Sequence, residues 1–231
     1  AFLRDLYFKL LDHSINIHWV PNIFALSLIN HNVKELAGIP IITLSESPLS
    51  GRALVAKTVE DKLLALLALV IVSPIMLLAA IAIKLDDPGP VFFFQERAGW
   101  DGKPFKIWKF RSMRIHEPEE DIVRQATIND PRVTRVGRFL RRMSIDELPQ
   151  LLNVLLGSMS LVGPRPHAIQ HNDLYSRKVD AYLARHRIKP GITGLAQVRG
   201  FRGETKDLRL MAERVKSDIE YINNWSILLD L

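Results

Sequence analysis

The stretch "LLALLALVIVSPIMLLAAIAI", residues 63–83, is an apolar run that only Ser73 and Pro74 interrupt. About 20 apolar residues suffice for a helix to cross the hydrocarbon core of a bilayer, so hydropathy alone favours a simple transmembrane helix. Pro74 opposes a straight helix, because proline removes a backbone hydrogen bond and clashes with the preceding turn. Ser73 can satisfy the freed carbonyl group, which makes a kink tolerable in lipid. We therefore expect the membrane helix to break at Ser73 and Pro74.

Basic residues flank the apolar run on both sides. Arg52, Lys57 and Lys62 precede it, and Lys84 and Arg97 follow it. The positive-inside rule depends on an asymmetry of such charges, so it gives no clear direction here. A re-entrant helix, which enters the membrane, bends and returns to the same face, agrees with both the charges and the proline. We prefer it to a straight span.

The composition predicts affinity for anions. The chain of 231 residues carries a formal net charge of +6 and has a pI of about 9.6, which favours phosphates, nucleic acid or an acidic membrane surface as partners. It contains no cysteine, which excludes disulfides and thiolate metal sites and is compatible with the cytoplasm. It begins without methionine or a signal-peptide pattern and stops in an apolar run, so we expect a fragment at both ends.

Residues 1–50 have the pattern of half a small α/β unit. Residues 15–20 ("INIHWV") and 38–44 ("GIPIITL") are typical of strands, and residues 22–36 between them are typical of a helix. This order predicts a βαβ piece. It has no G-x-G-x-x-G motif, so nothing in it supports dinucleotide binding. We expect residues 51–62 to be a linker that approaches the membrane.

Two strand-like runs follow the apolar segment. They lie at residues 89–99 and 103–113 and are joined around Asp101–Gly102, which is a strong hairpin signal. In the second run Lys109 and Arg111 fall on the same face. These charges are either the solvated side of a half-buried strand or a basic edge that faces a phosphate, and the pattern leaves both open.

Residues 130–144 ("DPRVTRVGRFLRRMS") predict a helix with an arginine stripe. Arg135, Arg138 and Arg142 fall on one face of such a helix, with bulky apolar residues on the others. This arrangement suits a membrane interface, where long basic side chains reach the headgroups. A plain solvated face is the alternative.

The adjacent acids Asp146 and Glu147, within "RRMSIDELPQ" at residues 141–150, repel each other and therefore need a positive partner. Ser144 can form a capping box with Glu147, or Pro149 can take the first position of the following helix. Either register places the carboxylates at a helix N-terminus, where they complement the helix dipole. That structural role alone would explain the pair.

Arginines surround this acid pair and change its interpretation. Arg141 and Arg142 precede it, and Arg165 follows it between Pro164 and Pro166, so a stiff loop presents the Arg165 guanidinium. Arginines on two sides of a carboxylate pair indicate a phosphate site with a metal ion. One acid would hold a hard cation through oxygen, and the other would attack phosphorus.

Three motifs carry a resemblance to a known family. They are "KFRSM" (109–113), "SIDELPQLLNVLLGSMSLVGPRP" (144–166) and "KPGITGLAQVRG" (189–200). With these motifs in this order, the chain from about residue 56 onward resembles the bacterial sugar transferase family, the monotopic polyprenyl-phosphate hexose-1-phosphate transferases. Its tail, residues 200–231, is similar to the undecaprenyl-phosphate glucose phosphotransferases of the colanic acid and xanthan type.

The resemblance implies a fold. Large members of the family carry a Rossmann-like α/β domain before the catalytic domain, so residues 1–50 are expected to be its C-terminal part. The expected class is a membrane-associated α/β (α+β) protein. It would have a re-entrant helix over residues 63–83, and over residues 84–231 a mostly helical catalytic domain with a small β-hairpin.

The resemblance also implies chemistry. Family members transfer a sugar 1-phosphate from a nucleotide diphosphate sugar to a polyprenyl phosphate and use Mg²⁺ as cofactor. Carried over to this chain, catalysis and metal binding fall to Asp146 and Glu147, with a phosphosugar-aspartyl intermediate on Asp146. The family's phosphate-contacting arginines map onto Arg141 and Arg165. The basic edge of the second strand-like run adds Lys109 and Arg111 to the expected phosphate- and substrate-binding residues.

The expected partners are a UDP-sugar, undecaprenyl phosphate and membrane lipid, and the expected product is UMP. The location would be the bacterial inner (cytoplasmic) membrane, with the catalytic domain on the cytoplasmic face. The tail favours glucose over galactose or an N-acetylated sugar. Leu195 and Ala196 stand where many members have a tryptophan, which leaves the sugar and nucleotide contacts of this loop open. The sequence also leaves open whether the protein is a homodimer.

Two other classes of protein would share some of these features. A membrane-anchored scaffold that binds phosphate headgroups would keep the arginines but would not need the acid pair. A nucleic-acid-binding domain would explain the net charge. However, aromatic residues are sparse among the basic runs and no nucleic-acid-binding signature is present, so we expect no nucleic acid.

Overall fold

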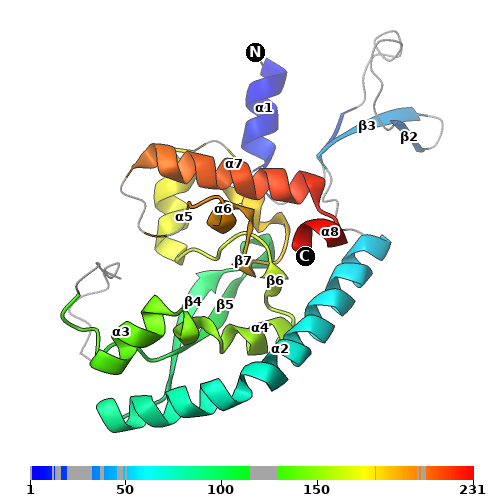
Figure 1. The fold of residues 1–231 in the computed structure, drawn as a ribbon. Coiled ribbons are helices and arrows are strands. Elements are labelled where there is room, and N and C mark those ends of the chain that lie inside the picture. The colour runs from blue at the N-terminus through cyan, green and yellow to red at the C-terminus, as the bar shows by residue number, and fades with distance from the viewer. Residues whose placement is uncertain are drawn as a thin grey trace.

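The structure is a computed structural model of the chain. It describes residues 2–11, 13, 17–19, 33–36, 39–45, 49, 51–114, 130–179, 181–201, 203 and 207–231. Figure 1 shows helix α2 (Gly51–Asp86) along one side of a mixed helical and β unit. Strands β4 (Phe92–Ala98) and β5 (Pro104–Phe110) lie in the middle of this unit, and helix α7 (Leu208–Asn224) lies on the side away from α2.

Helix α2 is continuous through the predicted break. It contains Pro74, and Figure 1 shows that its two halves run in different directions. Because Pro74 has no N–H, the carbonyl group of Val70, four residues earlier, loses its helical partner. The hydroxyl of Ser73 donates to this carbonyl at 2.8 Å, which confirms the role predicted for Ser73. The segment is therefore one bent helix.

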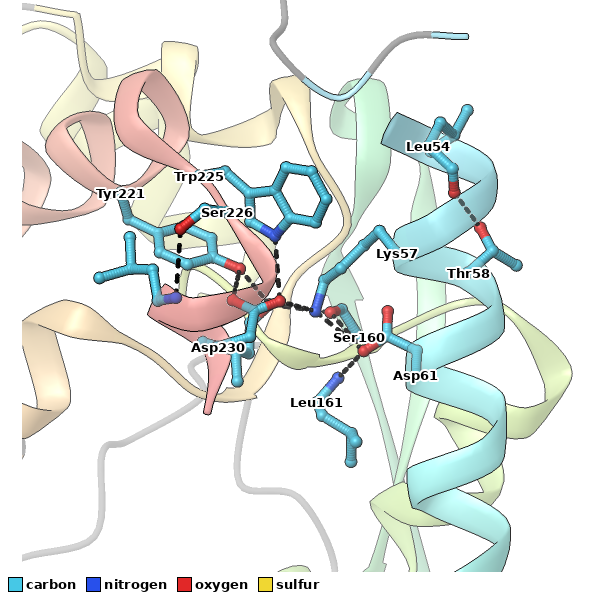
Figure 2. Close-up of polar contacts among 12 residues, drawn as sticks. Leu54, Lys57, Thr58, Asp61, Ser160, Leu161, Tyr221, Trp225, Ser226 and Asp230 are labelled. Atoms are coloured by element: carbon cyan, nitrogen blue, oxygen red, sulfur yellow. Dashed lines mark hydrogen bonds and ion pairs between the residues drawn. The ribbon is translucent and has the colours of Figure 1, made fainter. Parts of the chain in front are cut away.

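The predicted linker over residues 51–62 is wrong, because these residues form the first turns of α2. Figure 2 shows how they are held. The ammonium group of Lys57 pairs with Asp61 at 2.9 Å and with Asp230 of helix α8 (Ile227–Asp230) at 2.6 Å. All three residues are buried or have buried side chains, so the start of α2 is fixed by internal ion pairs.

Further hydrogen bonds extend this junction (Figure 2). The carboxylate of Asp61 accepts from the Ser160 hydroxyl at 3.0 Å. Asp230 accepts from the hydroxyl of Tyr221 at 2.6 Å and from the indole N–H of Trp225 at 3.0 Å. The chain before the apolar run is thus tied to segments that follow it by about 100 residues and more.

Strands β4 and β5 form the predicted hairpin. They pair antiparallel with Phe93 opposite Lys109 and Arg97 opposite Phe105. The connection is the short helix η2 (Trp100–Gly102), which places Asp101 in a left-handed conformation with φ 55°. An aspartate tolerates this conformation better than most residues, which explains the hairpin signal in the sequence.

Helix α3 (Arg135–Arg142) confirms the predicted arginine helix. The hydroxyl of Thr134 caps it by accepting from the N–H of Gly137 at 2.9 Å. Asp86, at the end of α2, accepts from the N–H of Val136 at 3.0 Å. The second end of α2 is therefore also joined to the globular unit.

The predicted capping box at Ser144 is wrong. Ser144 adopts a left-handed conformation with φ 57° and makes no capping hydrogen bond with its side chain. The chain instead turns through the short helix η3 (Ile145–Glu147), and helix α4 (Gln150–Leu156) starts directly after Pro149. Pro149 thus sits one residue before the position that the second register predicted.

Both halves of α2 pack against this unit. The half before Pro74 shares a core cluster with β5 and α4, and the half after Pro74 shares one with β5 and α3. The buried members of the first cluster are Ala65, Ile107, Leu151, Val154 and Met159. Those of the second are Ala79, Ile83, Phe110 and Leu140. Small alanines on this face let the helix approach closely.

The opposite face of α2 is apolar and exposed. In the described part of the chain α2 is the one helix long and apolar enough to cross a membrane. Its exposed apolar side chains include Leu63, Leu66, Leu67, Val70, Ile71, Leu77 and Leu78. Soluble monomers rarely expose an apolar surface of this extent, so this face is built to contact another apolar phase.

Two short parallel strands, β6 (Ser160–Val162) and β7 (Gly191–Thr193), bring two sequence motifs together. The approach requires glycine, because a Cβ on Gly191 would lie 2.2 Å from the backbone nitrogen of Gly163. A Cβ on Gly194 would lie 2.2 Å from the carbonyl oxygen of Gly163. The glycines of "VGPRP" and "KPGITG" are thus explained by backbone packing.

The N-terminal region contains helix α1 (Phe2–Leu11) and strands β1 (Ile17–Trp19), β2 (Val33–Leu36) and β3 (Ile39–Ser45). Strands β1 and β3 fall where strands were predicted. Residues 33–36 were predicted as helix but form β2, and the rest of that predicted helix lies outside the described residues.

The sheet order is β1-β3-β2 and both pairings are antiparallel. A βαβ unit requires parallel strands joined by a crossover of a dozen or more residues, whereas two residues connect β2 to β3. The predicted βαβ piece is therefore wrong, and the strands do not support a Rossmann-like assignment for residues 1–50.

Candidate active site

The acid pair lies in η3, the turn between α3 and α4. Asp146 and Glu147 are both only 9% exposed. The left-handed residue Ser144 turns the chain after α3, so the acids face strand β5 and do not extend the helix. Burying two adjacent carboxylates is unfavourable without positive partners.

Two cations neutralise Glu147. The ammonium group of Lys109 donates to Oε1 at 2.8 Å. The Arg165 guanidinium donates to Oε1 at 2.6 Å and to Oε2 at 3.2 Å. Burial alone would raise the pKa of Glu147, but the hydrogen bonds from Arg165 and the charge of Lys109 outweigh it and hold the pKa well below its usual range. Glu147 is therefore a carboxylate at neutral pH.

Asp146 is in a different electrostatic state. It forms no ion pair with any residue that the structure describes. Burial raises the pKa of Asp146; the charges of Lys109 and Arg141 partly oppose this effect, and Glu147 adds to it. Glu147 is thus bound through both carboxylate oxygens, whereas Asp146 has no cationic partner among the described residues. Two neighbouring carboxylates whose pKa values are shifted in opposite directions commonly have different chemical roles.

The loop that carries Arg165 is held at several points. The N–H of Gly191 donates to the Pro164 carbonyl at 2.9 Å, and the N–H of Gly163 donates to the Thr193 carbonyl at 2.9 Å. These bonds hold the loop in place, in agreement with the stiff loop that the flanking prolines predicted. They belong to the contact between β6 and β7, which was not predicted from the sequence.

A buried arginine also holds this loop through a hydrogen bond to its backbone. Arg185, in the short helix η4 (Tyr182–Arg187), donates to the carbonyl of Arg165 at 2.7 Å and pairs with Asp218 of α7 at 2.8 Å. Burial raises the pKa of Asp218 to about 6, with the charges of Arg185 and Arg214 opposing the shift. Arg185 was not singled out in the sequence, because no local pattern marks a buried arginine.

The other predicted binding residues are used differently. Arg141, half-buried in the last turn of α3, lies near enough to Asp146 for its charge to lower the pKa of that acid. Arg111 pairs with Asp87 at 2.9 Å and also donates to the carbonyl groups of Asp87 and Pro88. The structure therefore brings Lys109, Arg141 and Arg165 to the acid pair and commits Arg111 to the end of α2.

A small pocket, partly open to solvent, lies near the start of α2, and its lining does not include the acid pair. Its lining includes Lys57, Asp61, Trp100, Ser160 and Lys189. Lys57, Asp61 and Ser160 are already bonded within the junction of Figure 2. The pocket is thus an extension of a structural junction.

The acid pair can contribute to a magnesium site but cannot complete one. In the described segments no group of three or more histidine, aspartate or glutamate side chains is placed to hold a metal. Glu147 already accepts three hydrogen bonds of the four that a carboxylate can accept, and Asp146 has both oxygens free of ion pairs. Mg²⁺ commonly uses one or two carboxylates with substrate phosphates and water as its other ligands. The oxygen donors present fit that arrangement.

Comparison with known proteins identifies the family. A family model described as bacterial sugar transferase matches residues 52–231. The chain belongs to the bacterial sugar transferase family. In this family member, the matched region begins at the first turn of α2 and contains the acid pair and all three sequence motifs.

Several curated relatives match nearly the whole chain. UDP-glucose:undecaprenyl-phosphate glucose-1-phosphate transferase from Escherichia coli (strain K12) is 48% identical over 231 residues, which cover 100% of this chain and 50% of that protein. The protein of the same name from Klebsiella pneumoniae is 47% identical over 229 residues, 99% of this chain and 49% of that protein. The one from Xanthomonas campestris pv. campestris is 48% identical over 231 residues, 99% of this chain and 48% of that protein. This bacterial sugar transferase chain thus spans about half the length of the curated relatives it matches.

Proposed function

We propose that the chain transfers glucose 1-phosphate from UDP-glucose to undecaprenyl phosphate and releases UMP. The observation that carries the proposal is the contrast within the acid pair: Glu147 is neutralised by Lys109 and Arg165, while the adjacent Asp146 has no ion pair among the described residues. The names of the relatives, which contain both substrates, support the choice of donor and acceptor.

The proposed reaction has two displacements at one phosphorus atom. In the first, a carboxylate oxygen of Asp146 attacks the phosphorus that bears glucose. An Asp146–phosphorus bond forms, the bond between the two phosphates breaks, and UMP leaves. In the second, an oxygen of the lipid phosphate attacks the same phosphorus and releases Asp146 as a carboxylate. The product is a lipid diphosphate sugar, and no net proton transfer is needed.

The surrounding charges make this attack feasible. Arg165 and Lys109 neutralise Glu147, and together with Arg141 they provide a positive field for the non-bridging phosphate oxygens. The raised pKa of Asp146 makes its carboxylate a better nucleophile than an ordinary aspartate. Mg²⁺, held by Asp146 or Glu147 together with the substrate diphosphate, would neutralise charge on the leaving UMP.

We also propose that α2 is re-entrant and that the catalytic part faces the cytoplasm at the bacterial cytoplasmic membrane. Lys57 precedes the apolar run and pairs with Asp230, which follows it. A straight span would place these two residues on opposite sides of the bilayer. The capping of α3 by Asp86 fixes the other end of α2 to the same unit. The cytoplasmic face is the side where nucleotide sugars are made.

The test is a nucleotide assay on the intact protein in lipid nanodiscs. We expect UMP from UDP-glucose when undecaprenyl phosphate and Mg²⁺ are present, less UMP from UDP-galactose and the N-acetylated UDP-sugars, and none after chelation with EDTA. Release of UDP in place of UMP would indicate transfer of the sugar alone and would overturn the proposal. Absence of any nucleotide product would favour a phosphate-binding scaffold.

A further inference from the structure

Arg97 lies on the face of the hairpin that carries Lys109. In the antiparallel register Arg97 is opposite Phe105 and Phe93 is opposite Lys109. Because side chains alternate along a strand and paired residues share a face, Arg97 and Lys109 project to the same side. The Arg97 guanidinium donates to the side-chain carbonyl of Gln95 at 2.6 Å. Its side chain therefore extends along β4 in the direction of Lys109.

The backbone next to Arg97 contacts the loop that carries Arg165. The N–H of Ala98 donates to the carbonyl of His167 at 3.3 Å, and His167 follows Arg165 by two residues. Arg165 binds Glu147 from this loop. The hairpin and the loop thus bring Arg97 beside the cations that surround the acid pair.

Arg97 has no acidic partner in the described part of the chain. Its Nε atom is buried and has no hydrogen-bond partner there, and Gln95 is neutral. Burial, with the like charge of Arg165, lowers the pKa of Arg97 to about 10, while Glu147 opposes the shift. Arg97 thus stays charged at neutral pH. Two partly buried guanidinium groups near each other, one of them without an acid, favour an anion between them.

We propose that Arg97 is a phosphate-binding residue of the active site. This inference rests on the proposed function and adds a residue that none of the three motifs contains. Four cations, Arg97, Lys109, Arg141 and Arg165, gather around two acids. The excess of two positive charges matches a diphosphate diester or a phosphate monoester, and guanidinium binds either one bidentately. The donor diphosphate and the lipid phosphate share this chemistry.

The test uses Arg97→Gln in the intact protein in nanodiscs, with Arg209→Gln as the matched control because Arg209 is exposed on α7. Thermal unfolding is measured with and without inorganic pyrophosphate or UDP. Without ligand, we expect Arg97→Gln to be at least as stable as the unchanged protein, because it removes a partly buried charge that has no acidic partner in the described part of the chain. We expect about a tenfold or greater loss of pyrophosphate affinity, as for one lost charge-assisted contact. The Arg209→Gln control should change neither the thermal stability nor the affinity for pyrophosphate.

Steady-state kinetics then identify the source of the phosphate. A KM for UDP-glucose raised about tenfold or more, together with weaker UDP binding, would assign Arg97 to the donor diphosphate. A raised KM for undecaprenyl phosphate with unchanged UDP binding would assign it to the acceptor. Either result supports the proposal. Unchanged affinities and KM values in a folded Arg97→Gln protein would overturn it and leave Arg97 a structural residue.

Arg97→Lys provides a second test in case Arg97→Gln does not fold. Arg97→Lys keeps the charge but cannot donate two parallel hydrogen bonds, so we expect a folded protein with partly reduced pyrophosphate affinity. Full affinity in Arg97→Lys would overturn the inference if Arg97→Gln cannot be studied. Pyrophosphate binding does not require turnover. A protein that binds pyrophosphate through Arg97 but releases no UMP would therefore contradict only the proposed function.

Discussion

Arg165 binds Glu147 through its two terminal guanidinium nitrogens, with Nη2 at 2.6 Å from Oε1 and Nη1 at 3.2 Å from Oε2. This two-point contact fixes the plane of the guanidinium next to Asp146. Backbone hydrogen bonds and Arg185 also hold the loop that carries Arg165. If Arg165 also binds phosphate, as proposed, a fixed guanidinium plane keeps its donors in place for the substrate.

Replacement of Arg165 by lysine should therefore reduce the rate much more than the stability. Lysine keeps a positive charge beside Glu147, so the buried acid stays paired, but the second donor toward phosphate is lost. By comparison with single oxyanion donors, we expect a loss of about 2.7–4 kcal/mol in transition-state stabilisation, or 10²–10³ in kcat. The measurements are UMP release and thermal unfolding. A rate near that of the unchanged protein would return Arg165 to a structural role.

The pH dependence of the first chemical step should reveal Asp146. Attack requires the carboxylate form, and burial raises the pKa of Asp146 above its ordinary 3.8. The rate should therefore fall, as pH is lowered, at a higher pH than an ordinary aspartate would give. Glu147 stays ionised there because its pKa is lowered. Single-turnover UMP release without lipid acceptor isolates this step, because UDP-glucose has no group that titrates in this range. An acid limb at or below pH 3.8 would contradict the assignment.

The ion pairs of Lys57 should matter for stability. In Lys57→Met the acids Asp61 and Asp230 remain buried without their cation, which should cost about 3–5 kcal/mol. Lys62→Met is the matched control, because Lys62 is exposed on the same helix and should change stability by less than about 0.5 kcal/mol. Thermal unfolding in nanodiscs compares the two. Equal melting temperatures for the two variants would mean that the ion pairs drawn in Figure 2 do not stabilise the position of α2.

Predictions from the sequence were most accurate where a pair of adjacent residues determines the local backbone conformation by itself. The Asp101–Gly102 pair marks the hairpin because both residues tolerate left-handed backbone conformations. Ser73 and Pro74 mark the bend because Pro74 removes the backbone hydrogen bond to the Val70 carbonyl and the Ser73 hydroxyl replaces it. The positions of Asp146 and Glu147 beside arginines were likewise readable from the chain.

Predictions failed where distant segments decide the outcome. Residues 33–36 have a helical pattern in isolation, yet pairing with β3 makes them a strand. Arg111 looked like a partner of Lys109, but a carboxylate 24 residues earlier binds it. The predicted linker before the apolar run is helical, and its Lys57 pairs with Asp230 of α8, a contact that the local sequence does not reveal.

The membrane topology can be tested by cysteine labelling, since the chain contains no cysteine. Arg52 and Lys103 are exposed positions before and after the apolar run. Single cysteines at these two positions should react with a membrane-impermeant reagent from the same, cytoplasmic side, because the ion pair of Lys57 with Asp230 holds both regions together. Labelling of the two positions from opposite sides would establish a straight span.

The proposed mechanism requires that Asp146 become covalently bonded to the sugar phosphate. The direct measurement is mass spectrometry of the intact protein and its peptides after incubation with UDP-glucose and Mg²⁺ but without lipid acceptor. We predict a glucose phosphate adduct on the peptide that contains Asp146, matched by one equivalent of UMP, and loss of both adduct and turnover in Asp146→Asn. Substantial turnover in Asp146→Asn, or an adduct on a different residue, would contradict this mechanism.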